Sequence, residues 1–136
     1  MEPLTDYVMD TVALVKYLED DLPKGANKAF REAEAGRARL YLPEIALGEF
    51  IYVALKGRLS KDNTRADVEE AVDQILATSF ISLSSLSHAA WDTLIDLDVP
   101  ELHDRMIVAD ALDRGLPLIT SDDTLKSVAG LRTVWR

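Results

Sequence analysis

Short apolar segments alternate with amphipathic stretches along this chain, and this alternation limits the possible folds more than any other feature. The apolar segments have the length of buried strands, and the amphipathic stretches have helical spacing. The predicted strands are 7–9, 39–42, 80–83, 116–120 and 131–135, and the predicted helices are 12–18, 24–35, 44–56, 64–76, 88–97 and 104–112. Strands that alternate with helices imply a parallel sheet covered on both faces. We expect an α/β fold: a three-layer α/β/α domain with a central parallel sheet of four to five strands.

Length and composition exclude several classes of protein. With 136 residues, the chain is long enough for one hydrophobic core, so we expect a single domain over residues 1–136. The absence of cysteine excludes disulfides, thiolate zinc sites and a cysteine nucleophile. The N-terminus lacks the basic flank and apolar core of a signal peptide, and the longest apolar run, 45–55, is too short to span a membrane. We expect a cytoplasmic protein that does not associate with membranes.

The net charge of −9 is unevenly distributed. Residues 37–65 carry six bases and three acids, whereas residues 66–124 carry thirteen acids and two bases. A protein that binds nucleic acid through bulk charge should be basic. If the partner is a polyanion, bound cations and the local basic segment must therefore offset the repulsion.

Local signals fix several helix ends. Thr64 and Asp67 have the spacing of a capping box, and Gly57 and Gly115 are placed as the residues that end helices. The helix 44–56 is apolar almost all round, which predicts that it is buried or shared with a partner.

Three acids have structural reasons to converge. Asp10 and Asp122 directly follow or lie just beyond short apolar strands, and Asp104 is expected to begin the helix 104–112. Open α/β sheets place their sites at the carboxyl ends of strands. Glu49 is a fourth candidate, because a carboxylate inside an apolar helix is costly unless it is paired or binds a cation.

Four carboxylates without soft ligands suit Mg²⁺ or Mn²⁺. Such an ion lowers the pKa of bound water and neutralises charge on a phosphoryl group, which are the requirements of phosphodiester hydrolysis. The sequence therefore predicts a divalent metal site with a hydrolytic role.

Each acid also has a simpler interpretation. Asp10 and Asp104 could each be a helix N-cap, and Asp122 or Asp123 could be a turn residue. Glu44 is a weaker rival to Glu49, because it lies nearer a strand end. Of the remaining polar residues, we expect His103 to be a surface residue beside the site, and Asp110 and Asp113 to be solvated.

The order of these motifs resembles the PIN domain family. The matching features are Asp-Thr at residues 10–11, Glu49 inside the third helix, the stretch Asp104 to Leu112, and Leu-Ile-Thr-x-Asp at residues 118–122. The chain departs mildly from the pattern at Asp110, where a small or hydroxyl residue is commoner. The size resembles that of VapC-type toxins, the ribonucleases of type II toxin–antitoxin pairs.

This resemblance implies a Mg²⁺- or Mn²⁺-dependent endoribonuclease that leaves a 3′-hydroxyl and a 5′-phosphate. Asp10, Glu49, Asp104 and Asp122 would be the acidic ligands, with Thr11 and Thr120 as hydroxyl neighbours. Basic residues that could contact RNA phosphates are Lys56, Arg58, Lys61, Arg65 and Arg105. The helix 44–55 would serve a homodimer or a cognate antitoxin.

Two other functions remain open at this point. One is a catalytically silent PIN-like module that binds RNA or protein, which the acidic composition favours. The other is a receiver domain with Asp10 near a metal, which is disfavoured because the chain lacks a paired acid at the first strand and a matching lysine after the last strand.

Overall fold

The computed structural model describes residues 5–57 and 64–136, which form a five-stranded sheet with helices on both faces. The strands are β1 (Tyr7–Met9), β2 (Leu40–Pro43), β3 (Ile81–Ser84), β4 (Leu118–Ile119) and β5 (Thr133–Val134). The helices are α1 (Thr11–Leu18), α2 (Lys24–Glu34), α3 (Glu44–Leu55), α4 (Arg65–Ala77), α5 (His88–Asp96) and α6 (Leu102–Arg114), with the 3-10 helix η1 (Asp123–Ser127). The predicted α/β/α architecture and parallel sheet are confirmed, and β4 and β5 are shorter than expected.

The sheet is parallel throughout and has the order β3-β2-β1-β4-β5. The chain moves outward from β1 to β2 and β3, then crosses back to the other side of β1 to form β4 and β5. The strand order therefore reverses between β1 and β4, where Val8 pairs with Leu118. Open α/β sheets bind ligands at such a reversal, beyond the carboxyl ends of the strands.

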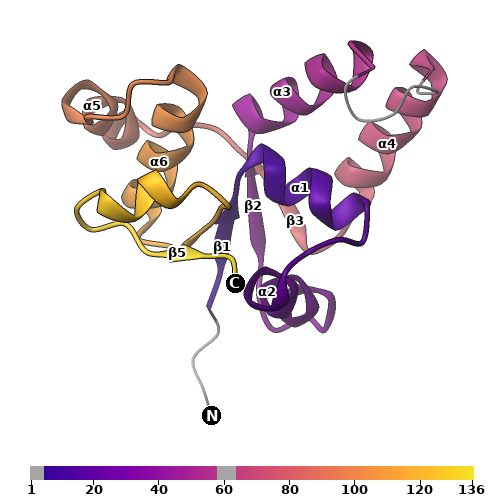
Figure 1. Ribbon diagram of the computed structural model, residues 1–136, viewed down its shortest axis with the longest axis horizontal. Helices are drawn as coiled ribbons and strands as arrows, with labels where there is room; N and C mark the ends of the chain where they lie inside the picture. Colours follow the sequence, from indigo (N-terminus) through magenta and orange to yellow (C-terminus); the bar gives the residue numbers. More distant parts are fainter. Residues whose placement is uncertain (1–4, 58–63) are drawn as a thin grey trace.

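Helices cover both faces of the central strands. Figure 1 shows α5 and α6 on one side of β1 and β2, and α1, α2 and α4 on the other, with α3 rising beyond the carboxyl end of β2. The strands are consequently apolar on both faces, and Val8, Met9, Leu42, Leu118 and Ile119 are completely buried. Each such side chain contributes roughly 1.5–3 kcal/mol when it leaves water.

The predicted helix-end signals are present. Thr64 and Asp67 form both hydrogen bonds of a capping box at the start of α4. Gly57 and Gly115 follow α3 and α6 with φ angles of 70° and 67°, a backbone conformation that favours glycine.

The predicted start of α6 was wrong. The helix begins at Leu102, and its N-cap is Glu101, whose carboxylate accepts a hydrogen bond from the Asp104 N–H at 2.7 Å. Asp104 instead lies in the first turn. The Asp104 carboxylate therefore takes no part in capping. Glu101 and Asp104 are both acids that can accept the hydrogen bond of a helix N-cap, so the sequence alone does not distinguish them.

The prediction that Asp110 is solvated was also wrong. Asp110 is 1% exposed and accepts hydrogen bonds from Ser84 Oγ at 3.1 Å and from Arg114 Nε at 3.0 Å. The Arg114 guanidinium also lies over the Tyr41 ring, 4.3 Å from its centroid. Burial raises the pKa of Asp110, and these two hydrogen bonds oppose that rise. Asp113 is exposed, as predicted, and accepts a hydrogen bond from Ser87 Oγ.

We expect Asp110→Ala to lower the free energy of unfolding by about 2–4 kcal/mol, because it leaves the buried Ser84 hydroxyl and the Arg114 guanidinium without their partner. Asp113→Ala, a matched change three residues later, should cost less than about 1 kcal/mol. Urea denaturation measures both. Equal losses would contradict a structural role for the buried network.

The C-terminal residues pack against the start of α2. The Ala26 N–H donates a hydrogen bond to the Trp135 carbonyl at 2.8 Å. A Cβ atom added at Gly25 would lie 2.5 Å from the Arg136 carbonyl oxygen. The packing at this point therefore requires a residue without a side chain.

We expect Gly25→Ala to destabilise the fold by about 1–3 kcal/mol, because backbone must move to admit the methyl group. Gly48→Ala is the control, since a Cβ there meets nothing within 4 Å and α3 should gain about 0.5–1 kcal/mol from the loss of a helix-interior glycine. Opposite signs in urea denaturation are the expected result. A Gly25→Ala variant as stable as the wild type would show that the C-terminal residues shift freely.

Candidate metal centre

The first candidate acid, Asp10, lies at the reversal point of the sheet. It directly follows β1, and its backbone N–H donates to the Ile119 carbonyl of β4 at 3.2 Å. Its carboxylate caps α1 by accepting a hydrogen bond from the Ala13 N–H at 2.8 Å. The simpler interpretation of Asp10 as an N-cap is therefore correct, and capping fixes the carboxylate at the carboxyl edge of the sheet.

Burial gives Asp10 unusual electrostatics. The residue is 9% exposed, and burial raises the pKa of its carboxyl to about 6. Hydrogen bonds from the Thr120 side chain and the Ala13 N–H lower this pKa, whereas the negative charges of Asp104 and Glu49 raise it further. These effects place Asp104 and Glu49 within electrostatic range of Asp10.

Glu49 faces the same region from α3. Its Oε1 accepts a hydrogen bond from the Thr11 hydroxyl at 2.5 Å, and its Oε2 lies 3.5 Å from His103 Nδ1. The rival Glu44 is exposed and accepts a hydrogen bond from Ser85 Oγ at 3.4 Å. The structure thus joins Glu49, through Thr11, to the residue next to Asp10.

Asp104 is half-buried in the first turn of α6. Burial is the largest cause that raises the pKa of its carboxyl, and the negative charges of Glu101, Asp122 and Glu49 raise it further. The nearby His103 acts in the opposite direction. The charges of both Glu49 and Asp122 therefore act on the Asp104 carboxyl.

Asp122 lies beyond β4 and is tied to Asp10 through one side chain. The Thr120 hydroxyl accepts a hydrogen bond from the Asp122 N–H at 3.1 Å, and the same side chain lies near Asp10 and lowers the pKa of its carboxyl. Asp122 Oδ1 accepts hydrogen bonds from the N–H and hydroxyl of Thr124, so Asp122 caps η1 as a turn residue would. The buried Thr120 is thus central to the arrangement.

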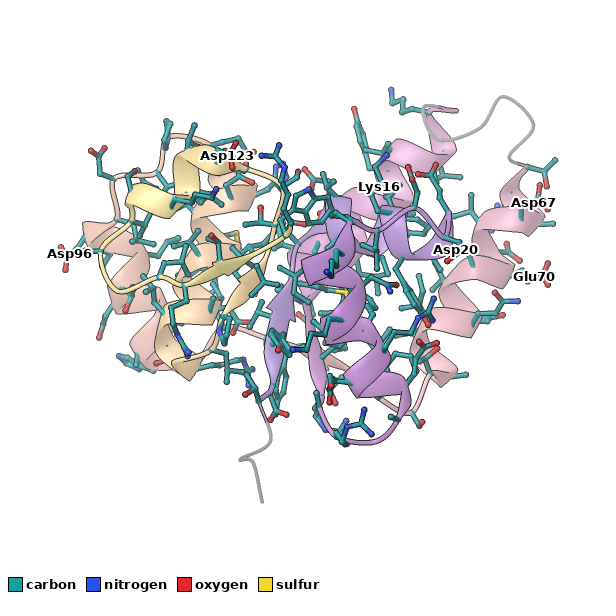
Figure 2. All side chains as sticks on the ribbon, turned by 60° about the horizontal axis from the view of Figure 1, so that its bottom comes forward. Lys16, Asp20, Asp67, Glu70, Asp96 and Asp123 are labelled. Carbon is teal, nitrogen blue, oxygen red and sulfur yellow. The ribbon has the colours of Figure 1, made fainter. Side chains whose placement is uncertain are left out.

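The neighbouring Asp123 differs in both position and contacts. It is exposed, and Figure 2 shows it on the periphery of the molecule. Its carboxylate pairs with Lys126 at 2.9 Å, and this pairing lowers the pKa of Asp123. Other exposed acids, such as Asp67 and Glu70 on α4 and Asp96 on α5, also point outward (Figure 2).

The basic residues predicted to contact RNA have varied positions. Lys56 ends α3 with its ammonium 5.2 Å from the Tyr52 ring centroid, and Arg65 pairs with Glu69 on α4. Arg105 donates from Nε to the Val99 carbonyl at 2.7 Å. Arg58 and Lys61 lie outside the described residues.

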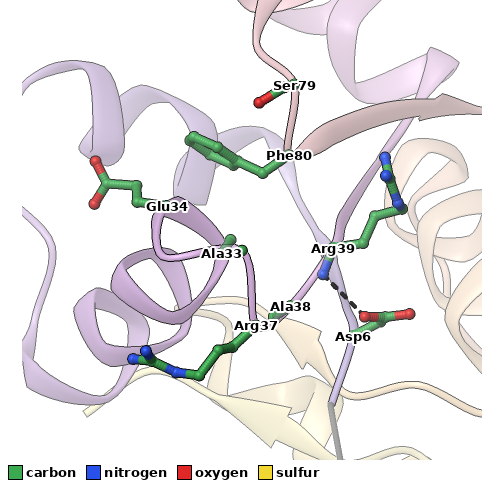
Figure 3. A pocket seen from close by; sticks show the side chains of 9 residues that line it. Asp6, Ala33, Glu34, Arg37, Ala38, Arg39, Ser79 and Phe80 are labelled. Carbon is green, nitrogen blue, oxygen red and sulfur yellow. Dashed lines mark hydrogen bonds between the residues drawn. The ribbon is translucent and has the colours of Figure 1, made fainter.

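A separate pocket of about 320 Å³ opens at the opposite edge of the sheet (Figure 3). Asp6, before β1, accepts a hydrogen bond from the backbone N–H of Arg39, before β2, at 2.9 Å. Arg37 pairs with Glu32 at 2.7 Å. None of the four candidate acids lines this pocket, and several of its charged side chains already pair with residues around it.

The four acids have the oxygen donors that Mg²⁺ and Mn²⁺ prefer, and like charges at a half-buried edge are stabilised by a cation. Within residues 5–57 and 64–136, however, no three acidic or histidine side chains lie close enough together to hold an ion as they stand. The hydrogen bonds of Glu49 to Thr11 and of Asp122 to Thr124 direct these carboxylates to partners within the protein.

A family model for the PIN domain matches residues 7–131 of this sequence. The chain belongs to the PIN domain family. This match spans the strands β1 to β4 and all four candidate acids, and it ends just before β5. A search of the curated proteins found no match to the sequence.

Several solved structures with the same fold are VapBC or VapC proteins. VapBC2 from Rickettsia felis, bound to a DNA fragment from its promoter, aligns with a TM-score of 0.74 and 18% identity over 95% of this chain and 97% of that one. VapBC-5 from Mycobacterium tuberculosis gives 0.61 and 17% over 97% and 99%. VapC20 from the same organism, a sarcin-ricin loop cleaving toxin, gives 0.56 and 18% over 93% and 98%. At these identities the similarity establishes the fold.

In this PIN domain we expect Asp10→Asn to increase stability when no divalent ion is present. The folded-state pKa of Asp10 is about 6, above its ordinary value of 3.8, so the wild type loses stability as the pH rises through that window. At pH 7.5 the asparagine variant, which can still cap α1, should be more stable by about 1–3 kcal/mol.

Urea denaturation in EDTA measures this difference, with Asp123→Asn as the control that should bring no gain. Excess Mn²⁺ should reverse the order, because an ion that binds the folded wild type stabilises it. A wild type more stable than Asp10→Asn in EDTA would contradict the electrostatic description of the site.

Proposed function

We propose that this PIN domain is an endoribonuclease that depends on Mg²⁺ or Mn²⁺. One observation carries the proposal: contacts connect the elements that hold the four acids at the reversal point of the sheet. The Asp10 N–H donates to the Ile119 carbonyl, and Thr11, next to Asp10, donates to Glu49. Glu49 in turn lies 3.5 Å from His103, next to Asp104. Asp10 is influenced by Asp104 and Glu49, and Asp104 by Asp122 and Glu49. Membership of the PIN family and the fold shared with an RNA-cleaving toxin, VapC20, support this function.

Asp10, Glu49, Asp104 and Asp122 would hold the ion, directly or through water. A bound Mg²⁺ or Mn²⁺ would neutralise phosphate charge and lower the pKa of a water molecule. To bind the metal ion, Glu49 and Asp122 would have to give up some of their present hydrogen bonds. The proposed ligand set therefore includes Asp10, whose carboxylate is fixed by capping α1, and Asp104, whose carboxylate is not used in capping. The other two carboxylates would have to adjust.

The surrounding residues orient these carboxylates. Thr120 lies beside the Asp10 side chain and binds the Asp122 backbone, and Thr11 binds one oxygen of Glu49. Because the chain carries a net charge of −9, phosphate binding without a cation would be opposed by repulsion. The candidates for phosphate contacts within the described residues are Lys56, Arg65 and Arg105, and hydrolysis would leave a 3′-hydroxyl and a 5′-phosphate.

An antitoxin is the proposed protein partner, since the solved structures that share the fold include VapBC toxin–antitoxin complexes. A groove of about 590 Å³ between α3 and α4 is lined by Ile51, Leu55, Val68 and Val72. Tyr52 and Leu55 are each 58% exposed, in agreement with the prediction that α3 is shared with a partner. Homodimerisation through α3 remains an alternative use of the same surface.

No helix in the described part of the chain has the length and hydropathy needed to cross a membrane, and cytoplasmic location remains a prediction.

The test is cleavage of end-labelled RNA by the purified protein in Mg²⁺, Mn²⁺ or EDTA. Glu49→Gln and Asp122→Asn should each lower the cleavage rate by about 100-fold or more, since each ligand supports several kcal/mol of transition-state stabilisation. Their matched controls, Glu44→Gln and Asp123→Asn, should retain wild-type rates.

The ends of the products should support ligation as 5′-phosphates. Equal cleavage by wild type, Asp10→Asn and Asp104→Asn would overturn the four-acid site. A folded wild type that binds RNA, but neither binds Mn²⁺ in calorimetry nor cleaves, would instead identify a catalytically silent binding module.

A further inference from the structure

His103 lies between two carboxylates at the start of α6. Its Nδ1 is 2.6 Å from Glu101 Oε1 and 3.5 Å from Glu49 Oε2. It is the second residue of α6, and its ring reaches from there toward α3. The side chain is 40% exposed. This position agrees with the expectation of a surface residue beside the site, and it brings His103 against one of the four candidate acids.

The surroundings determine which ring nitrogen carries hydrogen. Carboxylate oxygens accept hydrogen bonds, so a ring nitrogen that faces two of them must be a donor. Nδ1 is therefore protonated and donates to Glu101 Oε1. The distance to Glu49 is too long for a second strong hydrogen bond, so that contact is electrostatic.

Glu101 holds the imidazole in a fixed place. Its second oxygen, Oε2, caps α6 through the Asp104 N–H at 2.7 Å. One carboxylate thus connects the backbone of Asp104 with the ring of His103. The pKa of Glu101 is lowered overall, because hydrogen bonds from Asp104 and His103 outweigh the effect of burial, which acts in the opposite direction.

Glu49 is consequently held from two sides. The Thr11 hydroxyl binds Oε1 and His103 faces Oε2, so contacts run from α6 through α3 to α1. Without the imidazole, Oε2 would lose this contact, and the Glu49 side chain would regain rotamers that the contact now excludes.

We propose that His103, oriented by Glu101, is a positioning residue that holds the Glu49 carboxylate in register with Asp104. The inference rests on the proposed function, because it assigns a partner to one of the four proposed ligands. In this role His103 and Glu101 would orient a metal ligand without touching the ion. Removal of such a partner typically lowers metal affinity by 10–100-fold.

Two substitutions at one position test this. An asparagine side chain places its N–H near the location of Nδ1, whereas a glutamine side chain places it near Nε2. His103→Gln should weaken Mn²⁺ binding about 10-fold or more in calorimetry and lower kcat for RNA cleavage, with KM for RNA little changed. His103→Asn should remain within about threefold of the wild type.

The second histidine supplies a matched control. His88 also lies at the start of a helix, α5, but its side chain is 93% exposed and its partner is the exposed Asp92 at 3.9 Å. His88→Gln should therefore leave Mn²⁺ affinity, kcat and Tm unchanged.

A second variant keeps the proposal testable if His103→Gln folds poorly. In Glu101→Asp the shorter carboxylate can still cap α6, because aspartate is a preferred N-cap, but it cannot reach the ring as well. This variant should retain Tm and lose Mn²⁺ affinity in the same direction as His103→Gln.

The outcomes separate the two proposals. If the wild type binds Mn²⁺ and cleaves RNA while His103→Gln and Glu101→Asp behave like it, the positioning role is overturned and the proposed function stands. Equal losses in His103→Asn and His103→Gln would also overturn it. Asparagine keeps an N–H near the position of Nδ1, so a specific role of Nδ1 requires His103→Asn to lose less. A folded wild type that neither binds Mn²⁺ nor cleaves RNA overturns both.

Discussion

The parallel pairing of β1 with β4 is the constraint on which the rest of the structure depends. It joins two strands from opposite ends of the chain, with Val8 beside Leu118 and Met9 beside Ile119. Because the pairing is parallel, both strands end at the same edge of the sheet. Asp10 and Thr120 consequently meet there, and every other candidate residue is arranged around them. The helices supply the remaining acids, but this strand pair fixes where those acids converge.

Most of the fold could be predicted from the sequence, because its signals are local. Apolar segments, capping residues and the glycines after α3 and α6 report on neighbours a few residues away. Asp10 and Asp122 were recognisable for the same reason, since each lies just beyond a short apolar strand. Glu49 was recognisable as unusual because the residues around it in the sequence are almost all apolar.

The features that escaped prediction depend on distant partners. Asp110 is buried because Ser84 and Arg114 satisfy its carboxylate, and nothing near Asp110 in the sequence announces Ser84. Glu101 and Asp104 are both acids suited to cap α6, so the cap could be assigned only from three-dimensional contacts. The spacing of Glu101 before Asp104 was a signal that could have suggested it. His103 was expected at the surface beside the site, but its contact with α3 requires the tertiary arrangement.

The arrangement also has a temporal consequence. During synthesis the ribosome releases β1 early and β4 only after most of the chain has emerged. Until then Asp10 has neither its backbone contact to Ile119 nor the Thr120 side chain beside it, and Asp122 is absent. Pairing between such distant segments is also slow to form. Nascent or prematurely terminated chains that lack residues 104–122 therefore cannot bring the four candidate acids together.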